Sequence, residues 1–174
     1  MYEVHEHFKP LKAKIHWQLV QAEAQDLNIL KAMNTSSEIR EMQKELQNDR
    51  TFCFLARHGK EFISQGIVTI GPGNIHLPGN KRQFPIKKEE AYLHYGKTLK
   101  NYQRQGVSSS LVSNIILKLH THFSIKRFFV GVSGNNRASR HQMNKFGFIL
   151  LQKFSQFNLL GAVVTRHVQM KTNT

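Results

Sequence analysis

The segment from residue 90 to residue 133 limits the possible folds more than any other part of this chain. Residues 90–100 (EAYLHYGKTLK) alternate as a strand does, a helix with an apolar face follows from about Val107 to about His122, and residues 126–133 (KRFFVGVS) form a short apolar strand. A helix that joins two strands in this way packs against one face of their sheet. The segment therefore predicts an α/β fold.

The remaining segments add hairpin strands and further helices to this unit. They are a strand at 2–8, helices within 11–48 (the second opened by a capping box of Thr35 and Glu38), strands at 51–57 and 61–70, a long loop at 71–88, a helix at 135–146 ended by Gly147, and strands at 148–157 and 162–170. The order β-α-α-β-β-β-α-β-α-β-β predicts a mixed, mostly antiparallel central sheet flanked by helices, an α/β (α+β) fold. With 174 residues, we expect a single domain, residues 1–174.

The composition indicates a globular protein of a reducing compartment. Hydrophobic residues make up 40% of the chain, and no apolar run reaches the ~18 residues that a membrane span needs. Cys53 is the only cysteine, so it cannot form an internal disulfide. The first seven residues lack the basic and apolar regions of a secretory signal. We therefore expect a cytoplasmic protein without a membrane partner.

The charge of the chain is strongly positive. Lys and Arg number 25 against 11 Asp and Glu, which gives a formal net charge of +14, and such a surface attracts phosphate groups. The basic residues are spread along the chain, however, with dense clusters only at Lys81–Arg82, Lys87–Lys88 and Lys126–Arg127. This spread is typical of a solvated surface. A basic RNA- or nucleic-acid-binding module is the alternative from another functional class.

The loop between the strand at 90–100 and the next helix is a candidate anion site. Its sequence, NYQRQGVSSSLV, places Gly106 directly before the helix. The first turn of a helix has backbone N–H groups without partners and the positive end of the helix dipole, and both favour a phosphate. Gly106 permits a close approach of the backbone, and Arg104 adds a positive charge.

Two motifs in the second half of the chain resemble those of the GNAT superfamily of acyl-CoA-dependent N-acyltransferases. Gln103-x-x-Gly106-x-Ser108 resembles its diphosphate-binding motif, Q/R-x-x-G-x-G/A, and Asn136-x-x-Ser139 opens a helix that runs into Phe146-Gly147-Phe148, as in its second cofactor motif. The resemblance covers residues 90–150 well, and only the element order supports it before that.

The resemblance implies an N-acetyltransferase that moves an acetyl group from acetyl-CoA to a primary amine and needs no metal. The arm of coenzyme A would lie between the strands at 90–100 and 126–133. The residues that the resemblance assigns to the cofactor are Thr98, Leu99, Gln103, Arg104, Gln105, Gly106, Val107, Ser108, Ser109, Asn136, Ser139 and Met143. A backbone N–H near Leu99 would stabilise the oxyanion. Met143 stands where many members have a tyrosine acid, and a thioether has no proton to give.

The base that takes the proton from the attacking amine is expected on the strand at 90–100. Strand alternation places Glu90, Tyr92 and His94 on one face, with Ala91, Leu93, Tyr95 and Leu99 on the other. His94 is the candidate base because the ordinary pKa of histidine is ~6.5. Tyr92 and Glu90 would line the acceptor site with it, and Tyr92 holds the place of a glutamate that is frequent in the family.

Several alternatives remain open in the sequence. The domain could bind acyl-CoA without catalysis, since the usual acid is missing at Met143. The acceptor could be a small molecule or a protein, and the basic residues of the loop at 71–88 favour an acidic one. A homodimer is compatible with the sequence, and nucleic acid is not expected as a partner. The pairs His5-x-His7 and His120-x-His122 lack companion ligands at metal-binding spacing, so no metal site is predicted.

Overall fold

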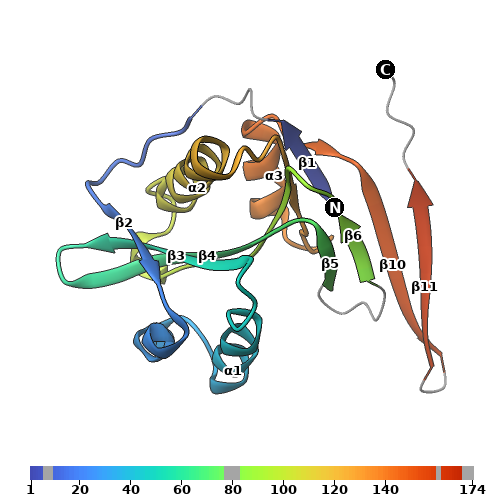
Figure 1. Ribbon diagram of the computed structural model, residues 1–174, viewed down its shortest axis with the longest axis horizontal. Coiled ribbons are helices and arrows are strands. Elements are labelled where there is room, and N and C mark those ends of the chain that lie inside the picture. Colours follow the sequence, from blue (N-terminus) through green and yellow to red (C-terminus); the bar gives the residue numbers. More distant parts are fainter. Residues whose placement is uncertain (6–9, 77–82, 160–161, 170–174) are drawn as a thin grey trace.

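The computed structural model describes residues 1–5, 10–76, 83–159 and 162–169 of the chain (Figure 1). Its elements in order are β1 (Tyr2–His5), β2 (Gln18–Ala22), η1 (Ala24–Ala32, a 3₁₀ helix), α1 (Ser36–Glu45), β3 (Thr51–His58), β4 (Glu61–Ile70), β5 (Gly73–His76), β6 (Gln83–Ile86), β7 (Glu90–Thr98), η2 (Lys100–Tyr102, a 3₁₀ turn), α2 (Val107–Phe123), β8 (Arg127–Val130), α3 (Arg137–Lys145), β9 (Ile149–Leu150), β10 (Gln152–Leu159) and β11 (Ala162–Gln169).

A seven-stranded mixed sheet forms the centre of the described structure, in the order β2-β3-β4-β7-β8-β1-β9. Only β7 and β8 run parallel, and every other pair in this sheet is antiparallel. β5 with β6 and β10 with β11 form two separate hairpins beside it (Figure 1). The predicted mixed, mostly antiparallel sheet is therefore confirmed.

Helices cover both faces of the sheet. α2 and α3 lie on one face, and α1 and η1 lie on the other (Figure 1). On the α2 face, Leu111, Ile115 and Leu119 pack against the sheet, as the apolar periodicity of that helix requires. On the other face, Leu27 of η1 and Met42 of α1 are fully buried against apolar side chains of β3 and β4. The site described below includes the strands β7 and β8 of this sheet and a pocket on the α1 face.

The second half of the chain agrees closely with the sequence-based elements. The strands β3, β4 and β7, the helices α2 and α3, and the left-handed Gly147 (φ 82°) all lie where they were predicted. The capping box of α1 is also present, since the Thr35 side chain accepts a hydrogen bond from the N–H of Glu38 and the Glu38 side chain accepts one from the N–H of Thr35.

The first predicted helix is wrong. Residues 10–17 have no helix, and they are followed by β2 and then by η1. Apolar residues at odd positions from Leu11 to Leu19 pack against the core, while Lys12, Lys14 and His16 between them are exposed. This period of two is the pattern of an extended chain, and it prevails over the helical spacing of Ile15 and Leu19.

Two other segments also differ from the prediction. The expected loop at 71–88 contains the β5–β6 hairpin, and its tip at 77–82 lies outside the described residues. The expected strand at 148–157 is divided into β9 and β10, because pairing with β1 ends at Leu150. The first strand is described only as far as His5.

Candidate active site

A fork between the parallel strands β7 and β8 lies at the centre of the site. The two strands pair from Glu90 with Arg127 to Leu93 with Val130, where β8 ends. β7 continues to Thr98 and beyond the fork pairs only with β4 on its other side. Among the described strands, the edge of β7 that faces the fork has no partner from His94 onward, and an extended ligand with amide groups can pair with such an edge.

β7 carries a bulge just beyond this fork. The register with β4 shifts between Gln65 and Ile67, and Tyr95 has a positive φ of 49°. The bulge turns the Tyr95 side chain to the α1 face. There it packs against the apolar cluster that includes Leu27 and Met42, and its ring lies 5.1 Å from that of His94. The prediction that Tyr95 faces away from His94 is therefore wrong, because simple alternation assumes a regular strand.

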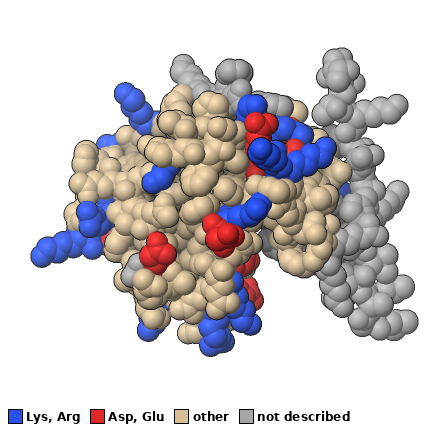
Figure 2. Space-filling model, in the orientation of Figure 1, with Lys and Arg blue, Asp and Glu red and all other residues tan. Residues whose placement is uncertain are grey.

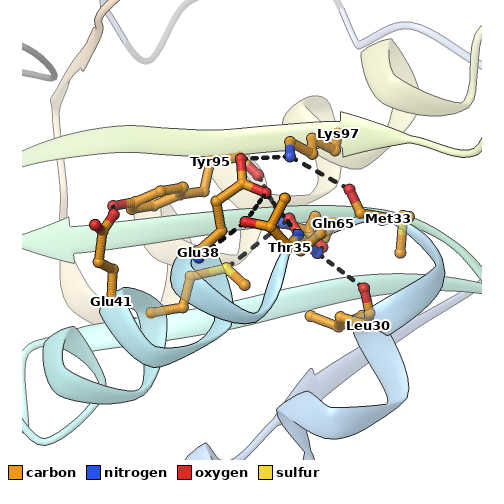
Figure 3. A network of polar contacts seen from close by, with 10 residues as sticks. Leu30, Met33, Thr35, Glu38, Glu41, Gln65, Tyr95 and Lys97 are labelled. Atoms are coloured by element: carbon orange, nitrogen blue, oxygen red, sulfur yellow. Dashed lines mark hydrogen bonds and ion pairs between the residues drawn. The ribbon is translucent and has the colours of Figure 1, made fainter.

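Buried polar side chains fix the bulge to the α1 layer (Figure 3). Gln65 donates from Nε2 to the Tyr95 carbonyl at 3.1 Å and accepts at Oε1 from Asn34 Nδ2 at 2.6 Å. On the flanks of the bulge, the Tyr95 hydroxyl donates to Glu41 at 3.1 Å, and Lys97 Nζ contacts Glu38 Oε1 at 2.6 Å. With both of its amide ends bonded, Gln65 holds β7 in the irregular conformation.

The loop predicted as an anion site leads into the start of α2. Gly106 precedes this 17-residue helix with φ 80°, and no described side chain caps its first turn. The group that lies close to Gly106 belongs to the protein itself. A Cβ on Gly106 would lie 3.1 Å from the carbonyl oxygen of Lys12. The Lys14 N–H also donates to the Gln105 carbonyl at 2.8 Å. The segment at 12–14 thus supports the loop from behind, and the helix start remains without a cap.

Other motif residues brace this loop. Gln103 Nε2 donates to the Thr98 carbonyl at 3.1 Å, and Gln105 Nε2 donates to the Asn101 carbonyl at 2.9 Å. Ser108 Oγ accepts from Gln142 Nε2 at 3.1 Å, which joins the start of α2 to α3. Arg104 is exposed, with φ 62°. The side chains of Gln103 and Gln105 therefore hold the loop through its carbonyl groups, and the exposed Arg104 is its positive charge.

Three more residues predicted at the cofactor have partners inside the protein. The Leu99 N–H donates to the Ile63 carbonyl at 2.9 Å, so it is not free to bind an oxyanion. Asn136 Oδ1 accepts from the Ser139 N–H at 3.0 Å and caps α3. Met143 is 5% exposed and packs in the larger core cluster. Val107 is buried in the same cluster, which leaves its backbone N–H as the group that could reach a ligand.

A pocket of about 230 Å³ lies on the α1 face, beside the fork. It is lined by Lys44, Glu45, Asn48, Thr51, Thr69, Asn74, Ile75, His76, Tyr92 and His94. Tyr92 and His94 stack with their ring centroids 5.1 Å apart. His94 Nδ1 lies 3.4 Å from Glu45 Oε2, and its Nε2 lies 3.4 Å from Thr69 Oγ1. The structure thus brings two of the three predicted catalytic residues together and adds Glu45.

The environment of the pocket changes the protonation of its acid and its histidine. Burial lowers the pKa of His94 to about 3, so its imidazole is neutral at physiological pH. Burial, reinforced by the negative charge of Glu41, raises the pKa of Glu45 to about 7. A carboxyl group with a pKa near 7 can accept a proton and release it again in the neutral range. Glu45 is therefore better suited than His94 to act as a base here.

Glu90, the third predicted catalytic residue, lies apart from the pocket lining. Its Oε1 accepts from Arg127 Nη1 at 2.6 Å, and its Oε2 accepts from the Lys87 N–H at 2.7 Å. Arg127 also donates from Nε to Glu3 at 2.7 Å, which links β7, β8 and β1. Glu90 is buried with Glu3 around this arginine, and the three residues tie the strands together at the closed end of the fork.

Glu45 is not among the residues predicted from the sequence, although a sequence signal for it exists. Glu38, Glu41 and Glu45 recur at i, i+3 and i+7 on α1, so they share one face of the helix. In the structure these three residues contact Lys97, Tyr95 and His94, respectively. A row of glutamates beside a helix's apolar face indicates that the helix lies along a polar strand.

The histidine pairs and the apolar helices add no further site. His120 and His122 each bond a backbone carbonyl through Nδ1, those of Ile125 at 3.1 Å and Lys118 at 3.0 Å, while His7 lies outside the described residues. In the part of the chain that the structure describes, no group of three or more His, Cys, Asp or Glu side chains could hold a metal ion. Within that same part, every helix is too short or too polar to cross a membrane.

Comparison with solved structures places this fold among acetyltransferases. The chain superposes on the aminoglycoside 6'-N-acetyltransferase AAC(6')-Ih from Acinetobacter baumannii with a TM-score of 0.61, at 17% identity over 82% of this chain and 97% of that chain. A protein from Clostridium acetobutylicum described as a predicted acetyltransferase, solved with acetyl-CoA, gives a TM-score of 0.57 at 14% identity over 84% of this chain and 99% of that chain. A ribosomal-protein-alanine N-acetyltransferase from Brucella melitensis gives 0.57 at 10% identity over 75% and 90%.

The family comparison covers both the fork and the loop before α2. The search of curated proteins found no match to this chain. The model of the acetyltransferase (GNAT) family matches residues 17–148, which include β7, the glycine loop, α2 and α3. The chain therefore belongs to the GNAT family of acetyltransferases and is an N-acetyltransferase with acetyl-CoA as its co-substrate.

Proposed function

We propose that this enzyme transfers the acetyl group of acetyl-CoA to a primary amine of a small, polar and cationic acceptor. The acceptor would bind in the pocket between α1, β4, β5 and β7. The observation that carries the proposal is the contact of 3.4 Å between Glu45 and His94 in this pocket, next to the open edge of β7.

The start of α2 suits the diphosphate of coenzyme A. The side chains of Gln103 and Gln105 hold the loop that leads to the backbone N–H groups from Gln105 to Ser109. No described side chain caps this helix start. The charges of Lys12, Lys14 and Arg104, all exposed around the loop, add a positive field for the phosphates. The arm would then extend along the free edge of β7 towards the fork.

We propose Glu45 as the base and His94 as the residue that positions it. An alkylammonium has a pKa of ~10.4, so the acceptor must lose a proton before its nitrogen can attack. Glu45 takes this proton, because its raised pKa of about 7 makes it a stronger base than an ordinary carboxylate. His94 stays neutral, with its Nδ1 lying 3.4 Å from Glu45 Oε2 while Thr69 contacts its other nitrogen.

The lining of the pocket favours a cationic acceptor with hydroxyl groups. Besides Glu45, the pocket offers the amides of Asn48 and Asn74 and the hydroxyls of Thr51 and Thr69, and Lys44 and His76 also line it. Aminoglycoside acetyltransferases among the solved relatives act on amines of this kind. The basic loop suggested an acidic acceptor from sequence, but its Lys81 and Arg82 lie outside the described residues. The pocket itself presents Glu45, with the charge of Glu41 close enough to raise its pKa.

The test is release of free thiol from acetyl-CoA with a panel of amines. The panel should include polyhydroxylated polyamines, simple alkylamines and amino-terminal peptides with acidic or neutral side chains. We expect turnover with the first class, and a fall of kcat by about 10²–10⁴-fold in Glu45→Gln, the range for loss of a general base. Glu41→Gln is the matched control on the same helix and should retain turnover at pH 8.

Turnover confined to acidic peptides would contradict the proposed acceptor, and wild-type kinetics in Glu45→Gln would contradict the proposed base. Binding of acetyl-CoA without thiol release on any amine would instead identify an acyl-CoA-binding domain without catalysis.

A further inference from the structure

The hydroxyl group of Tyr92 is buried without a hydrogen-bond partner. The side chain is 1% exposed, and its Oη and Arg140 Nε are the two buried side-chain polar atoms of the described residues that lack a partner. A buried hydroxyl group without a partner destabilises the fold, so its retention requires another benefit. Because Tyr92 lines the pocket, a molecule that enters beside its ring could supply the partner that the protein lacks.

The position of this hydroxyl is defined by Gly131. Tyr92 pairs with Phe129 on β8, and its side chain reaches past the end of that strand, so that a Cβ on Gly131 would lie only 2.6 Å from Oη. Gly131 follows Val130, the last residue of β8 that pairs with β7. Oη thus lies where the strands separate, in space that exists because residue 131 has no side chain. Tyr92 also lines the pocket and stacks on His94.

We propose that Tyr92 Oη donates a hydrogen bond to the carbonyl oxygen of the thioester and stabilises the negative charge that develops on it. This inference rests on the proposed function, since it requires acetyl-CoA to reach the fork and the amine to attack from the pocket. As the C–N bond forms, the carbonyl electron pair moves to the oxygen that Tyr92 binds. When the pair returns, the C–S bond breaks, sulfur leaves as a thiolate with its electrons, and the second proton that the nitrogen loses neutralises this thiolate.

Tyr92 keeps its proton throughout these steps. Burial raises the pKa of Tyr92 above that of an ordinary phenol, while the leaving thiol has a pKa of only ~8.5. Transfer of the phenolic proton to the thiolate is therefore unfavourable, whereas a hydrogen bond to an oxyanion is strong. Other donors expected from sequence do not serve, because the Leu99 N–H is bonded to Ile63 and Met143 has no proton.

The experiment compares Tyr92→Phe with Tyr102→Phe, which loses an exposed hydroxyl bonded to Glu61. We expect Tyr92→Phe to lower kcat by about 10²–10³-fold, the usual effect of losing one oxyanion donor. Its affinity for acetyl-CoA should stay within threefold of wild type, and its melting temperature should be equal or higher, since the unpaired hydroxyl is removed. Tyr102→Phe should keep wild-type kcat.

A second readout is independent of turnover. The infrared carbonyl band of acetyl-CoA labelled with ¹³C at the carbonyl should shift to lower frequency on binding to the wild type, and Tyr92→Phe should abolish part of this shift. Gly131→Ala should behave like Tyr92→Phe, because the new methyl group would lie only 2.6 Å from Oη and displace it. Unchanged kcat in Tyr92→Phe, or an unchanged carbonyl band, would overturn the inference.

The outcome can be separated from that of the proposed function. If no amine is acetylated by the wild type, the proposed function fails, but the carbonyl band still reports whether Tyr92 binds the thioester. If Tyr92→Phe alters only the pH dependence and leaves the band unchanged, Tyr92 acts on the Glu45–His94 pair and the inference is wrong.

Discussion

Replacing Gly106 with alanine tests the anion site most directly. Gly106 has φ 80°, a conformation that costs other residues about 1–2 kcal/mol. A Cβ would also lie 3.1 Å from the Lys12 carbonyl oxygen and 3.4 Å from Ala13 Cα, so the loop or the segment behind it must move. We expect a loss of about 1–2 kcal/mol in stability, which for a chain of this length lowers the melting temperature by roughly 3–8 °C.

The displacement should also weaken the binding of acetyl-CoA. A hydrogen bond to a charged group contributes about 1.5–3 kcal/mol, and losing one of those at the diphosphate would raise Kd by roughly 10- to 150-fold. Gly147→Ala is the matched control, because its φ is 82° and open space surrounds the position of its Cβ. It should lose similar stability to backbone strain but keep wild-type affinity. Titration calorimetry with acetyl-CoA and thermal melting of both variants give the comparison.

The predicted anion site is wrong if Gly106→Ala binds acetyl-CoA as tightly as Gly147→Ala does. In that case the amides at the start of α2 do not hold the diphosphate, and the cofactor must be anchored elsewhere.

Three further predictions concern the α1 face. The value of kcat/KM should fall below about pH 7 as Glu45 takes up a proton. Glu41→Gln should move this fall to lower pH, because it removes the negative charge that helps to raise the pKa of Glu45. A pH–rate profile of both proteins measures the two effects. Stability should fall as the pH drops from about 4.5 towards 3, because the unfolded state then binds the proton that buried His94 excludes, whereas between about 7 and 4.5 proton uptake by the folded state at Glu45 opposes this effect. His94→Asn should flatten that slope in urea titrations at several pH values. Gln65→Ala should lower the free energy of unfolding by about 1–3 kcal/mol, because it leaves Asn34 and the Tyr95 carbonyl without their partner, and urea denaturation would reveal an unchanged stability if the network is unimportant.

The predictable parts of the fold are those in which local patterns and tertiary contacts agree. Strand β7, the glycine loop and α2 follow one another with clear periodicity and a clear start signal at Gly106, and the structure has them as predicted. Residues 11–19 contain apolar residues at both helical and alternating spacings. In such a segment tertiary packing decides, and here α2 and the sheet provide a surface that an extended chain can cover.

The bulge explains why the site itself was only partly predictable. Its positive φ at Tyr95 is enforced by Gln65 and Asn34, which lie 30 and 61 residues earlier in the sequence, so no local pattern around Tyr95 announces it. Glu45 became part of the site for the same reason, since only the packing of α1 along β7 brings it to His94. By contrast, the roles of Gln103 and Asn136 in bracing the loop and capping α3 arise from short-range contacts.

The charged side chains are distributed unevenly over the molecule, with a general excess of positive charge and a row of glutamates on the α1 face. Figure 2 shows Lys and Arg scattered over one side of the molecule with Asp and Glu between them, and this side has no continuous basic stripe of the kind that tracks a nucleic-acid backbone. A net charge of +14 provides a general positive field, and such a field would attract an anionic co-substrate.

The α1 face reverses this sign locally. Glu38, Glu41 and Glu45 follow β7 side by side, and each adds negative potential to the strand. Lys97 neutralises Glu38 and the Tyr95 hydroxyl binds Glu41, so only Glu45 faces the pocket as an acid without a cationic partner in the described structure. An ammonium group approaching the pocket would find a negative charge at the residue that must take its proton. The same contact would therefore bind the acceptor and activate it, which is why we assign the base to Glu45.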